Sequence, residues 1–132
     1  MVQCKYEEQK TTQALALKDL ESYFLKTLGL RIKSKPLTGI NLPFYLSSLF
    51  SLSTTDIKGT KLLLCVIEGK ERPSPAQIKK YAMELQTRTA LEPVFVLPGL
   101  SSWDRQRLIE GRISFVVPGR QLYLPTLLID LR

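Results

Sequence analysis

Three basic residues at alternate positions are the clearest candidates for chemistry in this chain. Arg31, Lys33 and Lys35 lie in the segment LRIKSKPLTGINLP, which a glycine and two prolines interrupt. If the segment is extended, side chains two residues apart point to one face, so these three form a row of positive charge. Such a row is typical of proteins that contact the phosphates of nucleic acid. A solvated strand face or loop is the alternative interpretation.

A second group of charged residues surrounds the next predicted hairpin. Asp56 follows its first strand, and Glu68, Gly69 and Lys70 form an E-x-K tripeptide at the end of its second strand. This pattern resembles the PD-(D/E)xK nuclease fold, in which two carboxylates hold Mg²⁺ and the lysine activates water or stabilises the transition state. The resemblance implies a Mg²⁺-dependent nuclease, or a degenerate descendant that binds nucleic acid. Solvated charges in turns are the alternative, because E-x-K is a common tripeptide and aspartate is frequent in turns.

The overall charge agrees with contact to a polyanion. The 132 residues include 19 Lys and Arg against 12 Asp and Glu, which gives a formal net charge of +7. That charge favours nucleic acid as a partner, although it also keeps a small domain soluble. The chain has no histidine, which excludes Ser-His-Asp and Cys-His catalysis and zinc sites that need histidine. Any catalysis depends on carboxylates, lysine, tyrosine or an unaided cysteine.

The two cysteines predict neither a disulfide nor a nucleophile. Cys4 lies in a polar segment, and Cys65 lies inside the apolar run LLLCVI, where a buried and inert thiol is expected. No apolar run approaches the roughly 20 residues that a membrane span needs, and the N-terminus has no signal-peptide core. We therefore expect a cytoplasmic protein without a membrane partner.

The order of predicted elements indicates an α/β protein. A helix is expected over 10–29, with Thr11 or Thr12 as its N-cap and Gly29 as its stop. A short helix should follow Pro43. The alternation in 50–55 predicts a half-exposed strand at or near a sheet edge. Short apolar runs then predict further strands over 62–67, 94–97, 113–117 and 121–124.

Two helices are expected between these strands. Ser74 followed by Pro75 is an N-cap with proline at the first helical position, so a helix should begin there. Ser101 or Ser102 should cap the second helix. The side chains expected to point inward are Ile78, Tyr81, Ala82 and Leu85 in the first helix and Trp103, Leu108 and Ile109 in the second.

These elements predict one domain over 1–132 with a three-layer α/β/α architecture. Its sheet should be mixed, mainly parallel and built of about 4–5 strands. The order of helix, hairpin, helix and strand allows a restriction-endonuclease-like core. Residues 50–125 should form the hairpin and the β-α-β-α-β core, and 126–132 should form a C-terminal tail.

The last third of the chain carries a family pattern. It contains a serine pair, a short basic helix ending in L-I-E, a strand ending in V-P-G, and then Q-L-Y-L-P and I-D-L-R. This pattern resembles the N-terminal domain of bacterial MarR-type or winged-helix transcriptional regulators. The matching segments are Ser101-Ser102, Arg107 to Glu110, Val117 to Gly119, Gln121 to Pro125 and Ile129 to Arg132, with weaker upstream matches at Leu42 to Phe44 and Ser74 to Lys80.

The regulator resemblance implies a non-catalytic domain for sensing, dimerisation or partner binding. It implies that a winged helix follows the I-D-L-R segment, so contact with DNA is expected through a domain outside this chain. A homodimer is a further expectation. No cofactor is expected, and Mg²⁺ enters only with the nuclease alternative, so an enzyme is the less favoured interpretation.

Overall fold

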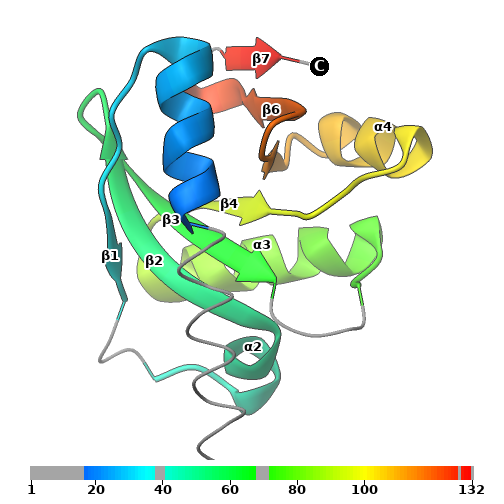
Figure 1. Ribbon diagram of the computed structural model, residues 1–132. Coiled ribbons are helices and arrows are strands. Elements are labelled where there is room, and N and C mark those ends of the chain that lie inside the picture. Colours follow the sequence, from blue (N-terminus) through cyan, green and yellow to red (C-terminus); the bar gives the residue numbers. More distant parts are fainter. Residues whose placement is uncertain (1–16, 38–40, 68–71, 128, 132) are drawn as a thin grey trace, which may run out of the picture.

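The computed structural model describes residues 17–37, 41–67, 72–127 and 129–131 (Figure 1). The first described element is a helix over 17–28, called here the N-terminal helix. The elements after it are β1 (Ser34–Pro36), α2 (Phe44–Leu49), β2 (Phe50–Ile57), β3 (Thr60–Ile67), α3 (Pro75–Thr89), β4 (Glu92–Val96), α4 (Ser102–Glu110), β5 (Ser114–Val117), β6 (Gln121–Leu124), the 3₁₀ turn η1 (Pro125–Leu127) and β7 (Ile129–Leu131).

The strands form one mixed sheet in which every strand lies beside its neighbours in sequence. Within the described ranges the sheet has seven strands, in the order β1-β2-β3-β4-β5-β6-β7. The pairs β3–β4 and β4–β5 are parallel, because α3 and α4 return the chain to the same end of the sheet. The other four pairs are antiparallel. The prediction of a mixed α/β sheet is confirmed, but the prediction of about 4–5 mainly parallel strands is wrong. The short strands at both ends account for the difference.

The central strands are apolar after their first residues, because a buried cluster lies on each face of the sheet. Successive residues of β3 alternate between the two clusters: Leu63 and Cys65 belong to one, and Leu62 and Leu64 to the other. The helices α2, α3 and α4 contribute to the first cluster, and the N-terminal helix contributes Leu20 and Phe24 to the second (Figure 1). Continuous apolar strands are what burial on both faces requires.

Strand β2 is half-exposed, as its alternation predicted, but its hydroxyl-bearing face is the buried one. Ser51, Ser53 and Thr55 are all buried, and the Ser53 side chain is completely inaccessible. They lie on the face that the N-terminal helix covers, so this polar face is turned inward. Strand β2 lies next to the short edge strand β1, so the prediction of a strand at or near a sheet edge is confirmed. A serine or threonine is small enough to be buried there, and the Thr55 hydroxyl donates to the carbonyl oxygen of Lys33 at 2.9 Å.

The turns and caps follow local sequence signals. Lys58 and Gly59 join β2 to β3, and both have positive φ, as a type I′ hairpin turn requires. The N-cap Ser74 makes a capping box with Gln77 at the start of α3. Ser101 caps α4 by accepting from the backbone N–H of Asp104.

After β4, one side chain differs from its predicted placement, and one short strand was not predicted. Trp103 is 68% exposed rather than inward, whereas Leu108 on the same helix is buried. The expected tail over 126–132 contains η1 and β7, and β7 pairs antiparallel with β6. The predicted start of the first helix, by contrast, lies outside the described residues. None of the described helices is both long and apolar enough to cross a membrane.

Truncating the buried face of α3 should destabilise the protein strongly. Leu85 is 0% exposed within the cluster on that face, so Leu85→Ala leaves a cavity and should cost about 2–5 kcal/mol of unfolding free energy. Met83→Ala is the matched control, because Met83 lies on the same helix and is 66% exposed. It should change stability by less than about 0.5 kcal/mol. Urea unfolding measures both, and equal costs would contradict this placement of α3.

Candidate functional site

The predicted row of basic residues lines one groove at the end of the sheet. Arg31, Lys33 and Lys35 share this groove with Lys61 of β3, and its volume is about 670 Å³. Residues of β2, the last residue of α3 and a residue just after that helix complete the lining: Thr54, Thr55, Asp56, Thr89 and Leu91. Four cationic side chains from the segment before β1, from β1 and from β3 therefore converge. Figure 1 shows that α3 runs toward the side of the sheet where β1 lies.

Alternation along an extended segment explains why the three cations share a face. Between them, Ile32 is buried against the N-terminal helix, and the Ser34 hydroxyl donates to Glu21 of that helix at 3.3 Å. Arg31, Lys33 and Lys35 are exposed and alternate with these two residues. The inward residues anchor the segment, so the basic side chains must point to the opposite face.

Strands β2 and β3 add polar groups to the same face. Lys35 pairs with Thr54, and Asp56 pairs with Lys61 across the hairpin. Lys61 is two residues from Leu63, which belongs to the α3-side cluster, so its side chain lies on the α3 side of the sheet. The sequence analysis missed Lys61. Side chains two residues apart in a strand lie on one face, so the position of Lys61 relative to Leu63 could have indicated its side of the sheet.

The groove has an excess of positive charge. Its lining carries four cations and one carboxylate, that of Asp56, whose Oδ1 accepts from the backbone N–H of Gly59 at 2.9 Å. Within the described parts of the chain, the ion pair closer than 4.0 Å is Arg88–Glu84 on α3, which involves none of the groove cations. The groove therefore presents positive charge that no described ion pair balances.

The threonines of the groove differ in whether their hydroxyls already make a hydrogen bond within the protein. The Thr89 hydroxyl donates to the carbonyl oxygen of Leu85 and accepts from the N–H of Leu91, so it is used at the end of α3. The Thr55 hydroxyl donates to the carbonyl oxygen of Lys33. The Thr54 side chain makes no hydrogen bond to another described residue, and it is the hydroxyl that a ligand in the groove can use.

The residues of the predicted nuclease site are not brought together by the described structure. Glu68 and Lys70 lie outside the described residues. Asp56 is at the turn end of the hairpin, paired with Lys61, whereas Ile67 pairs with Phe50 at the opposite end. The six residue steps from Lys61 to Ile67 span roughly 20 Å of extended strand.

Nothing described near Asp56 fits a Mg²⁺ site. A metal ion of this kind is held by several oxygen ligands at short distance, and Asp56 is the groove's one carboxylate. In the described ranges, no three His, Cys, Asp or Glu side chains gather closely enough to hold a metal ion. The nuclease interpretation of Asp56 stays a prediction without support from this hairpin.

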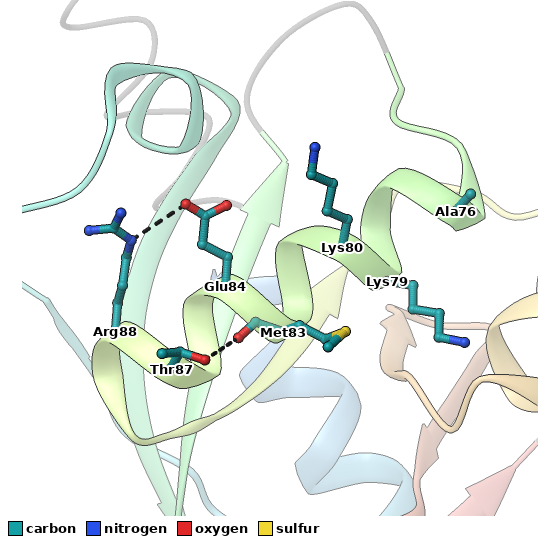
Figure 2. A pocket seen from close by; sticks show the side chains of 7 residues that line it. All are labelled: Ala76, Lys79, Lys80, Met83, Glu84, Thr87 and Arg88. Carbon is teal, nitrogen blue, oxygen red and sulfur yellow. Dashed lines mark hydrogen bonds and ion pairs between the residues drawn. The ribbon is translucent and has the colours of Figure 1, made fainter.

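A second hollow lies on the outer face of α3, with a volume also near 670 Å³ (Figure 2). Its lining comes from one helix, and two of its polar groups already have partners elsewhere in the protein. The Tyr45 hydroxyl of α2 donates to Glu84 Oε2 at 2.6 Å, and Arg88 donates to the Asn41 carbonyl oxygen at 3.4 Å. Arg88 Nε lies 3.5 Å from Glu84 Oε1, and the Thr87 hydroxyl donates to the Met83 carbonyl at 2.9 Å. Lys79 also projects from this face. It is a helix surface and not a convergence of segments, so the basic groove is the better candidate site.

Comparisons of this chain with protein-family models, with curated proteins and with solved structures give no match. The resemblance to MarR-type regulators therefore stays a prediction. The fold and the groove are the observations from which a function has to be inferred.

Cys65 should be inert in the folded protein. Its thiol is completely buried, and burial raises its pKa far above the usual range, so the reactive thiolate is not formed. In a Cys4→Ser background, labelling of Cys65 by a thiol reagent should be on the order of a thousandfold slower in native buffer than in urea. The exposed Ser47→Cys variant is the positive control and should react at once. Rapid native labelling of Cys65 would show that the core opens.

Proposed function

We propose that this chain is a non-catalytic binding domain that contacts the phosphate backbone of nucleic acid through the basic groove. The observation that carries the proposal is the convergence of Arg31, Lys33, Lys35 and Lys61 on one groove, with no described ion pair to neutralise them. Cations gathered in a concave site raise the local potential and attract polyanions. Their contact with phosphates releases counterions, which supplies most of the free energy of non-specific binding.

The chemistry of the groove suits phosphate groups better than base edges. Lysine ammonium groups bind phosphate as point charges, and Arg31 can offer two parallel N–H donors. The Thr54 hydroxyl adds a neutral donor. The lining includes neither asparagine nor glutamine, the residues that pair with adenine in the major groove. Contacts of this kind position a protein on nucleic acid without reading its sequence.

This role is compatible with a module of a bacterial transcriptional regulator. In such a protein the groove would add backbone contacts to those of a winged helix, and a homodimer would double them. We include in this proposal the three-layer α/β/α arrangement, which the buried clusters on the two faces of the sheet support.

A nuclease-like fold without nuclease activity is the second candidate. The observation that favours it is the order of the N-terminal helix, β1, β2, β3, α3 and β4, with antiparallel pairs first and then the parallel pair β3–β4. That order is similar to a restriction-endonuclease-like core. A degenerate member of that fold would bind nucleic acid through the same groove. The two candidates therefore differ in evolutionary origin more than in binding activity.

Neutralising the row should weaken nucleic-acid binding and reduce its salt dependence. Four phosphate contacts predict that log Kobs falls against log salt concentration with a slope of about −3.6 for duplex DNA. The double variant Lys33→Gln, Lys35→Gln should reduce that slope to about −1.8, because each contact contributes about 0.9. Fluorescence anisotropy with a labelled duplex, read at several salt concentrations, measures the slope.

The matched control for the row is the double variant Lys79→Gln, Lys80→Gln. It removes the same charge from the outer face of α3, away from the groove (Figure 2). If this control reduces the slope as much as the groove variant, binding follows net charge and not the groove. If the unaltered protein does not bind nucleic acid at all, the proposed function is wrong.

Removing the groove's carboxylate should strengthen binding. Asp56 repels phosphate, and asparagine keeps an oxygen that can accept from the Gly59 N–H. Asp56→Asn should raise duplex affinity about two- to fivefold, which corresponds to about 0.4–1 kcal/mol for an exposed charge. Glu110→Gln at the exposed end of α4 is the control with the same change in net charge. The nuclease alternative predicts instead that Asp56→Asn abolishes Mg²⁺-dependent cleavage, which a gel assay on the same duplex would detect.

A further inference from the structure

The four cations of the groove are not in one line. Arg31, Lys33 and Lys35 follow one another at two-residue steps, each about 6.7 Å long, so their row extends about 13 Å along the edge of the sheet. Lys61 lies on β3, two strands from β1, because β2 pairs with both. Two strand spacings place it about 10 Å to the side of the row.

The strip between the row and Lys61 is short and partly negative. It is formed by β2, whose side chains on this face are Thr54 and Asp56. A single phosphate backbone that follows the row does not pass over Lys61. A single backbone that crosses from the row to Lys61 passes over the Asp56 carboxylate, which repels it. The positions of the positive charges therefore suit two backbones that run on either side of Asp56.

The groove also lacks the feature that single-stranded nucleic acid needs. Proteins that bind single strands combine positive charge with aromatic side chains on which bases stack. Every residue that lines the groove is aliphatic, hydroxylated or charged. Trp103, an exposed aromatic side chain, lies on α4 with the Arg107 guanidinium 5.0 Å from its ring, and neither residue lines the groove.

From this geometry we infer that the groove binds duplex DNA across its minor groove, with the row on one backbone and Lys61 on the other. This inference rests on the proposed function. The minor groove of B-form DNA is about 6 Å wide between its two backbones, so an offset of about 10 Å between the row and Lys61 lets each reach a phosphate with a flexible side chain. Asp56 then faces the space between the backbones, where it is not opposite a phosphate.

The contacts of such a complex are with the backbone alone. Lys61 should contact DNA only in the duplex complex, whereas the row should contact both duplex and single-stranded DNA. Substitutions at the two places should therefore have different effects. The duplex should show a salt slope of about −3.6 from four contacts, and a single strand of the same sequence a slope of about −2.1 from three.

The test compares Lys61→Gln with Lys33→Gln, each on a labelled 16-base-pair duplex and on its single strand. Lys61→Gln should reduce the duplex slope to about −2.7 and leave the single-strand slope unchanged, whereas Lys33→Gln should reduce both. Lys61→Arg keeps the charge and should retain the duplex slope. Urea midpoints of all variants show whether folding is intact, and both substituted lysines are exposed.

The outcomes separate the inference from the proposal beneath it. An equal effect of Lys61→Gln on the two forms of DNA, or tighter binding of the single strand, overturns the duplex geometry and leaves phosphate binding at the groove intact. Absence of binding to both forms overturns the proposed function together with the inference.

Discussion

Burial on both faces of the sheet is the constraint from which the rest of this structure follows. Residues Leu62 to Val66 of β3 all lie at 5% exposure or less, and they alternate between a cluster under α3 and a cluster under the N-terminal helix. An ionised side chain in this region would lose its hydration with no partner to compensate, at a cost of several kcal/mol. Charged residues of the strands are therefore confined to the ends and the edge of the sheet.

The basic groove is a consequence of that confinement. The apolar part of strand β3 begins after Lys61, which lies next to the turn, and β1 is an edge strand of the described sheet. The buried Ile32 fixes the phase of the segment that carries the row. Once this residue is inside, Arg31 and Lys33 must be on the opposite face, because the side chains of an extended segment alternate. A core residue thus determines the orientation of the charges.

Local patterns predicted most of the elements, and tertiary contacts explain where they failed. The capping box at Ser74 and the turn at Gly59 depend on residues close in sequence, so they could be predicted. The buried hydroxyls of β2 could not, because their burial depends on a helix more than twenty residues away. Trp103 is apolar and at helical spacing, yet α4 turns Leu108 inward and leaves the tryptophan beside Arg107. A helix of nine residues has too few apolar positions to specify its buried face from sequence.

The sequence by itself determined the α/β class, the confinement of charge to the ends of apolar strands, and the row of cations at alternate positions. These features depend on the two-residue repeat of side-chain direction in a strand and on the free-energy cost of burying charge, and both are local properties. Only the tertiary structure decided that Lys61 joins that row and that Asp56 lies between them. It also separated Asp56 from Ile67 by the length of a hairpin. These facts depend on strand order and register, which bring together residues that are distant in sequence. The alternation of side chains along one segment does not specify either of them.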